Sequence, residues 1–393
     1  MRPVFYGITV EAFRLFCAFM NERISASKKL LFGCAAVGIG LAVFLLFAEA
    51  VLRFLPVNEG LRLMPVNREN PVFRFTPNRT AVWSEGWNFN IVNKVRVNND
   101  GFVNGQDYDP SSRRPLLAVI GDSYVEAGIV PYEETVQGRL AKAAGEGRVY
   151  SFAASGAGLS QYLVWARYAR DTYKPGAFVF VIIGNDFSEA LFHREHSPGF
   201  HHFERLQDGK AVLRRVDYNP GLLRRIGRQS ALFMYLMTNV KAQRLIHLDI
   251  QKILGKEDKR WVANIEAQAP EDVVKEYCWA FDRFLELLPA YTGVDPSRIA
   301  LVMDGFRPQM YRPGAMEEVR ESVWAKMRNY VQREATLQKM VVIDMHEVFM
   351  ERFGREGKRF EFPTDSHWNG EGHRAAADAI SRTELYQNLF PEN

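Results

Sequence analysis

A serine follows an apolar run near residue 120, in a position that suits nucleophilic chemistry. The run Leu116 to Ile120 predicts a strand, and Gly121-Asp122-Ser123 opens a helix-like stretch directly after it. The first N–H groups of a helix have no internal partner and carry the positive end of its dipole, so they stabilise an oxyanion beside the serine oxygen. The pattern predicts Ser123 as a nucleophile. The alternative is an ordinary turn with an N-cap.

A base and a carboxylate lie close together near the C-terminus, in the segment 363–370 (PTDSHWNG), which precedes a helix-like stretch. A neutral serine is a poor nucleophile unless an imidazole accepts its proton, and the imidazole needs a partner that fixes its tautomer. His367 is the predicted base and Asp365 the carboxylate that orients it. The alternative is that Asp365 caps the final helix and His367 lies exposed in its first turn.

Two further loops follow predicted strands between these ends. Residues 148–152 read as a strand that runs into 153–158, a loop of small residues in which backbone N–H groups can approach a ligand closely. The apolar run 177–183 ends in Gly184-Asn185-Asp186. A fully apolar strand is typical of a parallel sheet covered on both faces, and such sheets place their sites at the carboxyl ends of strands.

These four segments, in this order, resemble the motifs of the SGNH/GDSL hydrolases, a superfamily of serine esterases and acyltransferases. The resemblance covers roughly residues 115–380. It implies that Ser123 is the nucleophile, and that the backbone N–H groups of Ser123 and Gly156 form the oxyanion hole with the side-chain amide of Asn185. It also implies His367 as the general base and Asp365 as its carboxylate.

The chain departs from the common pattern of this superfamily at two points. Only Ser366 separates Asp365 from His367, whereas many relatives place the acid three residues before the histidine. An Asp-x-His-Trp block followed by Asn and Gly resembles the membrane-linked, polysaccharide-associated branch. Ser151 stands where the second motif often begins with Asn, which weakens a structural hydrogen bond rather than removing a catalytic group.

Strands and helices alternate along the core, which predicts a parallel sheet covered by helices on both sides. The strand candidates are 116–120, 148–152, 177–183, 299–303 and 340–345, with helical patterns at 133–144 and 317–336 between them. We therefore expect an α/β protein, a three-layer α/β/α sandwich around a five-stranded parallel sheet. The resemblance implies the same flavodoxin-like fold.

Two regions lie outside this alternation. Residues 56–110 are rich in Asn, Pro, Phe and Trp and predict a β-rich lead-in to the hydrolase domain, 115–393. Residues 187–296 exceed an ordinary crossover of about 2–6 residues and predict a cap-like insertion. Within it, 222–248 predicts an amphipathic helix, which either packs one face on the domain or presents its cations to an acidic polymer or to lipid headgroups.

No cofactor or metal is predicted. Four histidines crowd the start of the insertion, but their spacing matches no zinc motif, so we interpret them as surface or substrate-lining groups. They are His193, His196, His201 and His202. Asp304 and Arg307 follow another strand end, where they line the cleft, form an ion pair or cap an element.

An apolar segment near the N-terminus is long enough to cross a bilayer. Leu30 to Ala48 is uncharged, Lys28 and Lys29 precede it, and the apolar character continues to residue 52. These features predict a cytoplasmic segment 1–29, a transmembrane anchor 30–52 and a periplasmic or extracellular catalytic domain. The alternative is a signal peptide cleaved after the A-x-A pattern at 48–50, which exports the domain as well. Translation from Met20 instead of Met1 would shorten the basic head.

Composition excludes several classes of function. The chain has 393 residues, a net charge of +4 and no concentrated basic arm, which argues against nucleic-acid binding. Three cysteines, two of them in or before the apolar segment, give no disulfide framework.

The leading hypothesis is a serine esterase for O-acyl esters, including O-acetyl esters, of a cell-surface glycan. The alternatives are an O-acyltransferase for a polysaccharide and a non-catalytic glycan-binding scaffold.

Overall fold

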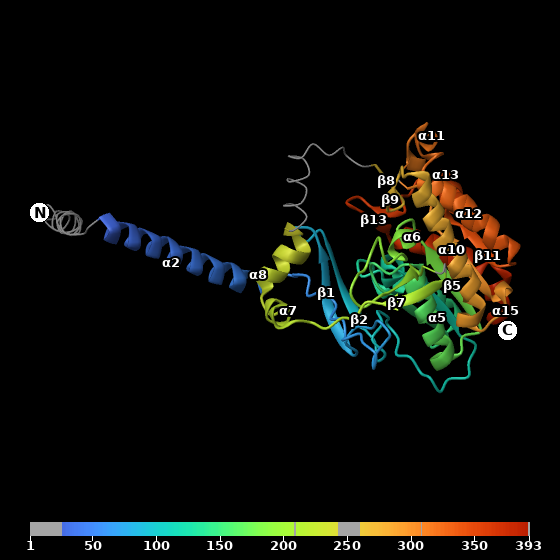
Figure 1. Ribbon diagram of the computed structural model, residues 1–393, viewed down its shortest axis with the longest axis horizontal. Helices are drawn as coiled ribbons and strands as arrows, with labels where there is room; N and C mark the ends of the chain where they lie inside the picture. Colours follow the sequence, from blue (N-terminus) through green and yellow to red (C-terminus); the bar gives the residue numbers. More distant parts are fainter. Residues whose placement is uncertain (1–25, 208–209, 243–259, 308, 392–393) are drawn as a thin grey trace, which may run out of the picture.

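Five parallel strands form the centre of the protein in the computed structural model, which describes residues 26–207, 210–242, 260–307 and 309–391. Across the sheet the strands lie in the order β11-β10-β5-β3-β4 (Figure 1). The strands are β3 (Leu117–Gly121), β4 (Val149–Ala153), β5 (Ala177–Ile182), β10 (Ile299–Met303) and β11 (Val341–Asp344). Each lies within one residue of its predicted ends, so the predicted sheet is confirmed.

Helices cover both faces of this sheet, so the predicted three-layer sandwich is also confirmed. On one face α5 (Leu159–Tyr173), α10 (Glu271–Thr292) and α12 (Val323–Leu337) share a core with Phe178 and Phe180 of β5. On the other face the helices are α4 (Val136–Ala144), α13 (Met345–Glu356), α14 (Gly370–Ser381) and α15 (Glu384–Leu389). Alternate β-strand side chains enter the two cores, which is why the strands are apolar throughout.

Capping residues account for the differences between the predicted and observed helices. The pattern at 133–144 begins as α4 only at Val136, because the Thr135 side chain caps the helix by accepting from Gly138 N–H. The pattern at 317–336 divides into α11 (Ala315–Val319) and α12, because Ser322 caps the second helix.

Short elements gather at the carboxyl ends of the strands. They are α3 (Ser123–Glu126) after β3, α6 (Asp186–Glu189) after β5, and the antiparallel hairpin β12 (Glu361–Phe362) and β13 (Asp365–Trp368) before α14. This edge of the sheet is where the sequence places the site.

A single apolar helix, α2 (Ala26–Leu52), projects from the domain (Figure 1). Its residues from Ser27 to Leu52 are apolar enough to span a membrane, with a mean hydropathy of 2.6. Of the predicted cytoplasmic segment 1–29, residues 1–25 lie outside the described part of the chain. The lead-in that follows contains the antiparallel hairpin β1 (Arg79–Glu85) and β2 (Ile91–Val97), and it contacts the core where Asn104 Nδ2 donates to Ser151 Oγ over 2.9 Å.

The segment 187–296 contains both additions and a core helix. The additions are the hairpin β6 (His201–Arg205) and β7 (Ala211–Arg215), the short helices α7 (Leu222–Gly227) and α8 (Ala231–Met234), a π-helical turn (Tyr235–Asn239) and the hairpin β8 (Trp261–Val262) and β9 (Ile265–Glu266). The remaining helix, α10, packs against α5 and buries Phe281 and Phe284, so it belongs to the helical layer.

The continuous amphipathic helix predicted for 222–248 is wrong for residues 222–242. The chain bends between α7 and α8, where the Ser230 side chain caps α8 by accepting from Phe233 N–H. Because a capping residue has non-helical dihedral angles, it breaks the helix that periodicity alone predicts. The rest of that range lies outside the described residues.

We predict that Gly158→Ala destabilises the protein. A Cβ atom at this position would lie 2.5 Å from Ala190 N and 2.7 Å from Asp186 O, which are rigid backbone atoms. Overpacking of this kind costs about 1–3 kcal/mol of unfolding free energy. The matched control is Gly354→Ala in α13, where nothing lies within 4 Å and the gain in helix propensity is up to about 1 kcal/mol. Urea unfolding should show opposite shifts, and equal midpoints for the two variants would contradict the close packing.

Candidate active site

Ser123 is held at the start of a short helix, α3, directly after β3, which lies between β5 and β4 in the sheet. Asp122 caps this helix, because its Oδ1 accepts from Tyr124 N–H over 2.9 Å. Gly121 is required before it, since a Cβ atom there would lie 2.4 Å from Val125 Cγ2. The turn therefore presents the Ser123 hydroxyl at the carboxyl edge of the sheet.

His367 and Asp365 lie on β13, which pairs with β12 in an antiparallel hairpin. The helix that follows is α14, and its N-cap is Asn369, whose Oδ1 accepts from the N–H groups of the first turn. The alternative in which Asp365 caps this helix is therefore wrong. Asp365 and His367 are two residues apart on one strand, so both side chains lie on the same side of it.

The structure brings these three side chains into one hydrogen-bonded row. Ser123 Oγ lies 2.8 Å from His367 Nε2. His367 Nδ1 lies 2.5 Å from Asp365 Oδ1, and the backbone N–H of His367 donates to the same oxygen over 2.9 Å. Asp365 thus keeps the proton on Nδ1 and leaves Nε2 free to accept the serine proton.

The electrostatics of the row suit a general base. Burial opposes protonation of His367, but the hydrogen bond and charge of Asp365, together with the charge of Asp122, outweigh it and raise the pKa of His367. Burial likewise opposes ionisation of Asp365, yet its hydrogen bonds and charge interaction with His367 lower the pKa of Asp365 to about 2. Asp365 is therefore ionised at every pH at which the site could work.

A buried ion pair holds β13, which carries His367, beside the serine helix, the short helix α3 that begins at Ser123. Arg307 Nε donates to Asp304 Oδ1 over 3.0 Å, and both side chains are buried. Arg307 also donates to the backbone carbonyl of Ser366 over 2.9 Å and to Tyr124 Oη over 3.2 Å. Trp368 Nε1 donates to Asp304 over 2.8 Å. The residues on either side of His367 are thus fixed to the end of β10, and the ion-pair interpretation of Asp304 and Arg307 is confirmed.

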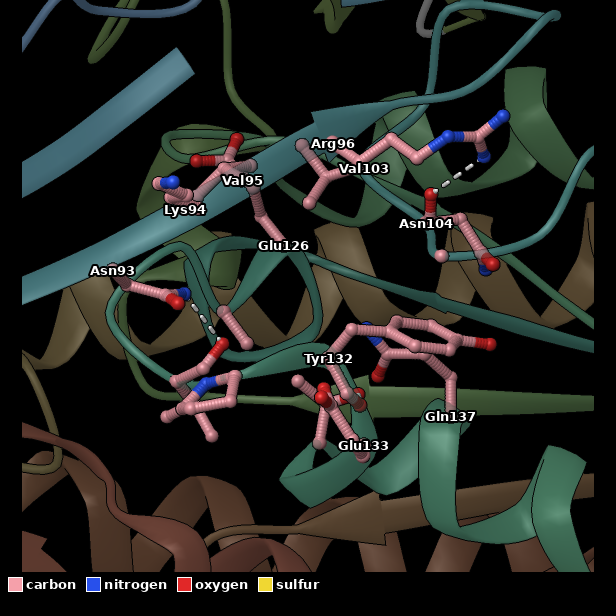
Figure 2. A pocket seen from close by; sticks show the side chains of 15 residues that line it. Asn93, Lys94, Val95, Arg96, Val103, Asn104, Glu126, Tyr132, Glu133 and Gln137 are labelled. Atoms are coloured by element: carbon pink, nitrogen blue, oxygen red, sulfur yellow. Dashed lines mark hydrogen bonds between the residues drawn. The ribbon is translucent and has the colours of Figure 1, made fainter. Parts of the chain in front are cut away.

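The loop that carries Gly156 is tied to the serine helix by a buried glutamate. Gly156 adopts φ +83°, which favours glycine. Next to it, Ser155 donates from its N–H over 2.8 Å and from its Oγ over 3.0 Å to the carboxylate of Glu126. Burial raises the pKa of Glu126 to about 7. Glu126 also lines a cavity of about 230 Å³ beneath β2 (Figure 2).

Asn185 lies at the end of β5, with its side chain between the cleft and a second buried carboxyl group. Asn185 Nδ2 donates to Glu189 Oε2 over 2.9 Å. Burial and the charge of Asp122 raise the pKa of Glu189 to about 8. Asn185 Oδ1 is buried, and no described atom donates to it. The carboxyl group of Glu189 therefore holds the Asn185 amide in place.

The groups predicted for catalysis meet in one cleft of about 740 Å³. Ser123, Gly156, Asn185 and His367 all line it. Its remaining walls come from α6, from α10 and from the hairpin β8–β9, and they include Arg194, Trp261, Asn264, Glu266 and Tyr277. Asp365 lies behind His367 and is absent from this lining.

The clustered histidines of the insertion have separate partners. His193 Nε2 lies 3.2 Å from a carboxylate oxygen of Glu276, and His202 Nδ1 lies 2.7 Å from the backbone carbonyl of Glu189. Within the described residues, no three His, Cys, Asp or Glu side chains gather in a group that could hold a metal ion.

Sequence reasoning missed Glu126 and Glu189, which act on the site through Ser155 and Asn185. A signal was available for both. Each is a carboxylate placed three or four residues after a predicted site residue, at the end of the short segment that follows a buried strand. Such a side chain returns to its own loop rather than to solvent, because a buried carboxyl group needs hydrogen-bond donors.

No protein-family model and no curated protein sequence matches this chain. Solved structures do match it. A lipolytic G-D-S-L family protein from Veillonella parvula is 12% identical, with 68% of this chain and 97% of that chain covered and a TM-score of 0.34. The lipase Lip_vut3 from a goat rumen metagenome is 13% identical, with 69% of this chain and 99% of that chain covered and a TM-score of 0.37. The salicylyl-acyltransferase SsfX3 of a tetracycline biosynthetic pathway is 14% identical, with 73% of this chain and 59% of that chain covered and a TM-score of 0.35. Because these TM-scores are low, the chemistry proposed for this site rests on the site's own geometry.

We predict that Arg307→Met destabilises the protein strongly. The substitution leaves the buried carboxyl group of Asp304 without its partner, and losing one member of a buried pair costs about 3–5 kcal/mol. The control is Arg320→Met, which removes an exposed pair with Glu317 and should cost at most about 1 kcal/mol. Thermal unfolding of both variants checks this, and similar melting temperatures would contradict a central role for the buried pair.

We predict that activity falls as the pH drops below the raised pKa of His367. The base must be neutral, so a raised pKa moves the acid limb of kcat/KM above the ordinary histidine value of about 6.5. Asp365→Asn removes the hydrogen bond and charge that raise this pKa, so the limb should move to lower pH. The same variant should lower kcat by roughly 10⁴ through the wrong tautomer.

A pH–rate profile of the variant beside the parent protein measures both effects. The exposed Asp295→Asn substitution serves as a control and should leave the acid limb in place. An unmoved acid limb in Asp365→Asn would contradict the assignment of this limb to His367.

Proposed function

We propose that this protein is a serine esterase of the SGNH type that works through an acyl-enzyme. One observation carries the proposal: Ser123 Oγ lies 2.8 Å from His367 Nε2, His367 is bonded to Asp365, and the serine opens into a cleft with Gly156 and Asn185. A nucleophile, a base and a carboxylate in this order form the minimal apparatus of acyl transfer.

The reaction follows from these positions. His367 Nε2 takes the proton of Ser123 Oγ while the oxygen attacks the ester carbonyl carbon, and Asp365 stabilises the imidazolium that forms. The N–H groups of Ser123 and Gly156 and the amide of Asn185 donate to the oxyanion. His367 then gives its proton to the departing alcohol, which leaves an acyl group on Ser123. Water activated by His367 attacks this ester, releases the acid and restores Ser123.

We further propose that the domain acts outside the cytoplasm, anchored by α2. Lys28 and Lys29 before the apolar run favour a cytoplasmic N-terminus. The Glu49 carboxylate supports a retained anchor over a cleaved signal peptide, because it accepts hydrogen bonds from the first N–H groups of α8. Cleavage after Ala50 would remove Glu49 and leave these groups without their acceptor.

An O-acylated glycan is the substrate class that the cleft supports best. The site is an open cleft of about 740 Å³, and the exposed indole of Trp261 lies on its rim. Aromatic faces and convergent polar groups, here Arg194, Asn264 and Glu266, are typical of sites that hold a sugar ring. The O-acyl group, including O-acetyl, would then reach Ser123 from a chain lying along the cleft.

We predict that Ser123→Ala abolishes ester hydrolysis and that Asn185→Ala lowers kcat by roughly 10²–10³, the usual effect of losing one oxyanion donor. A fluorophosphonate probe should label the parent protein at Ser123. It should fail to label His367→Ala, since the serine is then not activated, while the remote control Ser381→Ala should label normally. Full activity in Ser123→Ala would overturn the mechanism, and a folded parent protein that resists the probe would favour the glycan-binding scaffold.

Whether water or a glycan hydroxyl takes the acyl group from Ser123 is tested with acetyl and longer acyl esters, supplied with and without glycan. We expect free acid in both cases. Mass-spectrometric detection of acyl groups on the glycan, with free acid suppressed, would replace the esterase by an O-acyltransferase that uses the same acyl-enzyme.

A further inference from the structure

Apolar side chains are exposed in a cluster at the end of α2. Phe54, just after this helix, is 90% exposed, and Leu223 on α7 is 86% exposed. Leu222 and Ile226 of the same short helix are also exposed. Large apolar side chains exposed together on one short helix cost free energy in water and mark an interaction site.

Hydrogen bonds fix α8, and Gln229 just after α7, to the last turns of α2. The Glu49 carboxylate accepts from the N–H groups of Ala231, over 3.0 Å, and Leu232, over 2.9 Å. One turn later, Arg53 Nη2 lies 3.4 Å from the carbonyl oxygen of Gln229, just after α7. Figure 1 shows α7 and α8 at the end of α2, between it and the rest of the domain.

These contacts place α7 at the level of the bilayer surface. As a helix, the uncharged run from Leu30 to Ala48 is about 28 Å long, close to the ~30 Å thickness of a hydrocarbon core. Glu49 and Arg53 therefore lie in the headgroup layer when this run spans the membrane. Because α7 is held beside the same turns, its exposed leucines lie at that level too.

Cations surround the same point. Arg53, Arg62, Arg79 and Arg228 line a cavity of about 500 Å³, and Glu59 is the carboxylate there. Burial lowers the pKa of Arg79, and the charge of Arg62 lowers it further, which indicates cations crowded together. Within the described part of the chain, no carboxylate lies at ion-pair distance from Arg62 or Arg228. An anion would relieve this repulsion.

A second cavity extends the positive surface along α7. It has a volume of about 500 Å³, and its lining includes Arg62, Arg225 and Arg228. The apolar and cationic side chains of α7 thus form adjoining parts of one surface. A short segment with exposed leucines beside arginines is typical of an element that lies in the membrane interface.

We propose that this surface docks on an anionic phospholipid bilayer. We call it the α7 surface and define it as Phe54, Arg62, Leu222, Leu223, Arg225, Ile226 and Arg228. Its apolar side chains enter the boundary between headgroups and acyl chains, and its arginines bind lipid phosphates. The inference rests on the proposed insertion of α2 in a membrane, and it adds a second attachment that sets the tilt of the catalytic domain.

The test uses the full chain in nanodiscs that contain phosphatidylglycerol and lipids with a nitroxide near the headgroup. Leu223→Cys, with the native cysteines replaced by serine, carries an environment-sensitive fluorophore. Leu337→Cys on α12 is the matched control, because Leu337 is also a highly exposed leucine, at 72%, but lies outside the α7 surface. A protein that keeps only Cys34 reports on α2 itself. We expect nitroxide quenching at least about threefold stronger at position 223 than at 337.

The outcomes separate the two proposals. Quenching at 34 but not at 223 would overturn the α7 surface and leave the anchor intact. No quenching at 34 would overturn the anchor, and the docking inference with it. Adding Leu222→Glu and Ile226→Glu should restore fluorescence at 223, and persistent quenching there would also overturn the inference.

The charge requirement has its own matched variants. Arg225→Gln with Arg228→Gln should lower quenching at 223 about threefold, as should nanodiscs of neutral lipid. Arg320→Gln with Arg355→Gln removes the same charge from exposed sites elsewhere and should have no effect. Equal quenching in neutral and anionic nanodiscs would overturn the role of the arginines.

Discussion

The site depends on one buried ion pair, Asp304–Arg307. It lies at the end of β10, yet its hydrogen bonds reach Tyr124 of the serine helix and the backbone carbonyl of Ser366 beside the histidine. An ion pair without water is costly unless further hydrogen bonds satisfy it. Here those hydrogen bonds come from α3 and β13, the two segments that carry Ser123 and His367. The residues that satisfy the ion pair therefore also align Ser123 with His367.

The carboxyl groups around the serine divide into two kinds. Asp365, in contact with His367, has a pKa lowered to about 2 and remains ionised. Glu126 and Glu189 are buried, and the loss of hydration raises their pKa values to about 7 and 8. These two support the loops of Gly156 and Asn185 through hydrogen bonds. Raised pKa values favour the neutral forms of Glu126 and Glu189, which limits the negative charge that these two groups would place near a developing oxyanion.

The sheet could be predicted closely from the sequence, because a parallel strand buried on both faces is an apolar run and the runs have definite ends. The association of Ser123 with His367 and Asp365 could also be anticipated, from strand-end placement and the resemblance of four motifs. The break between α7 and α8 could not, because a single cap at Ser230 overrides the helical period. The roles of Glu126 and Arg307 depend on partners that only the tertiary structure supplies.

The nucleophile and its base lie 244 residues apart, near opposite ends of the domain. During synthesis, a chain that already contains Ser123 lacks the imidazole of His367 until β13 is made. The hairpin β12–β13 must then be anchored on Trp368 and on the carbonyl of Ser366 before the histidine reaches its position. In the proposed mechanism, Ser123 therefore becomes reactive only when the last part of the domain is completed, and a chain that ends before His367 lacks the base that activates it.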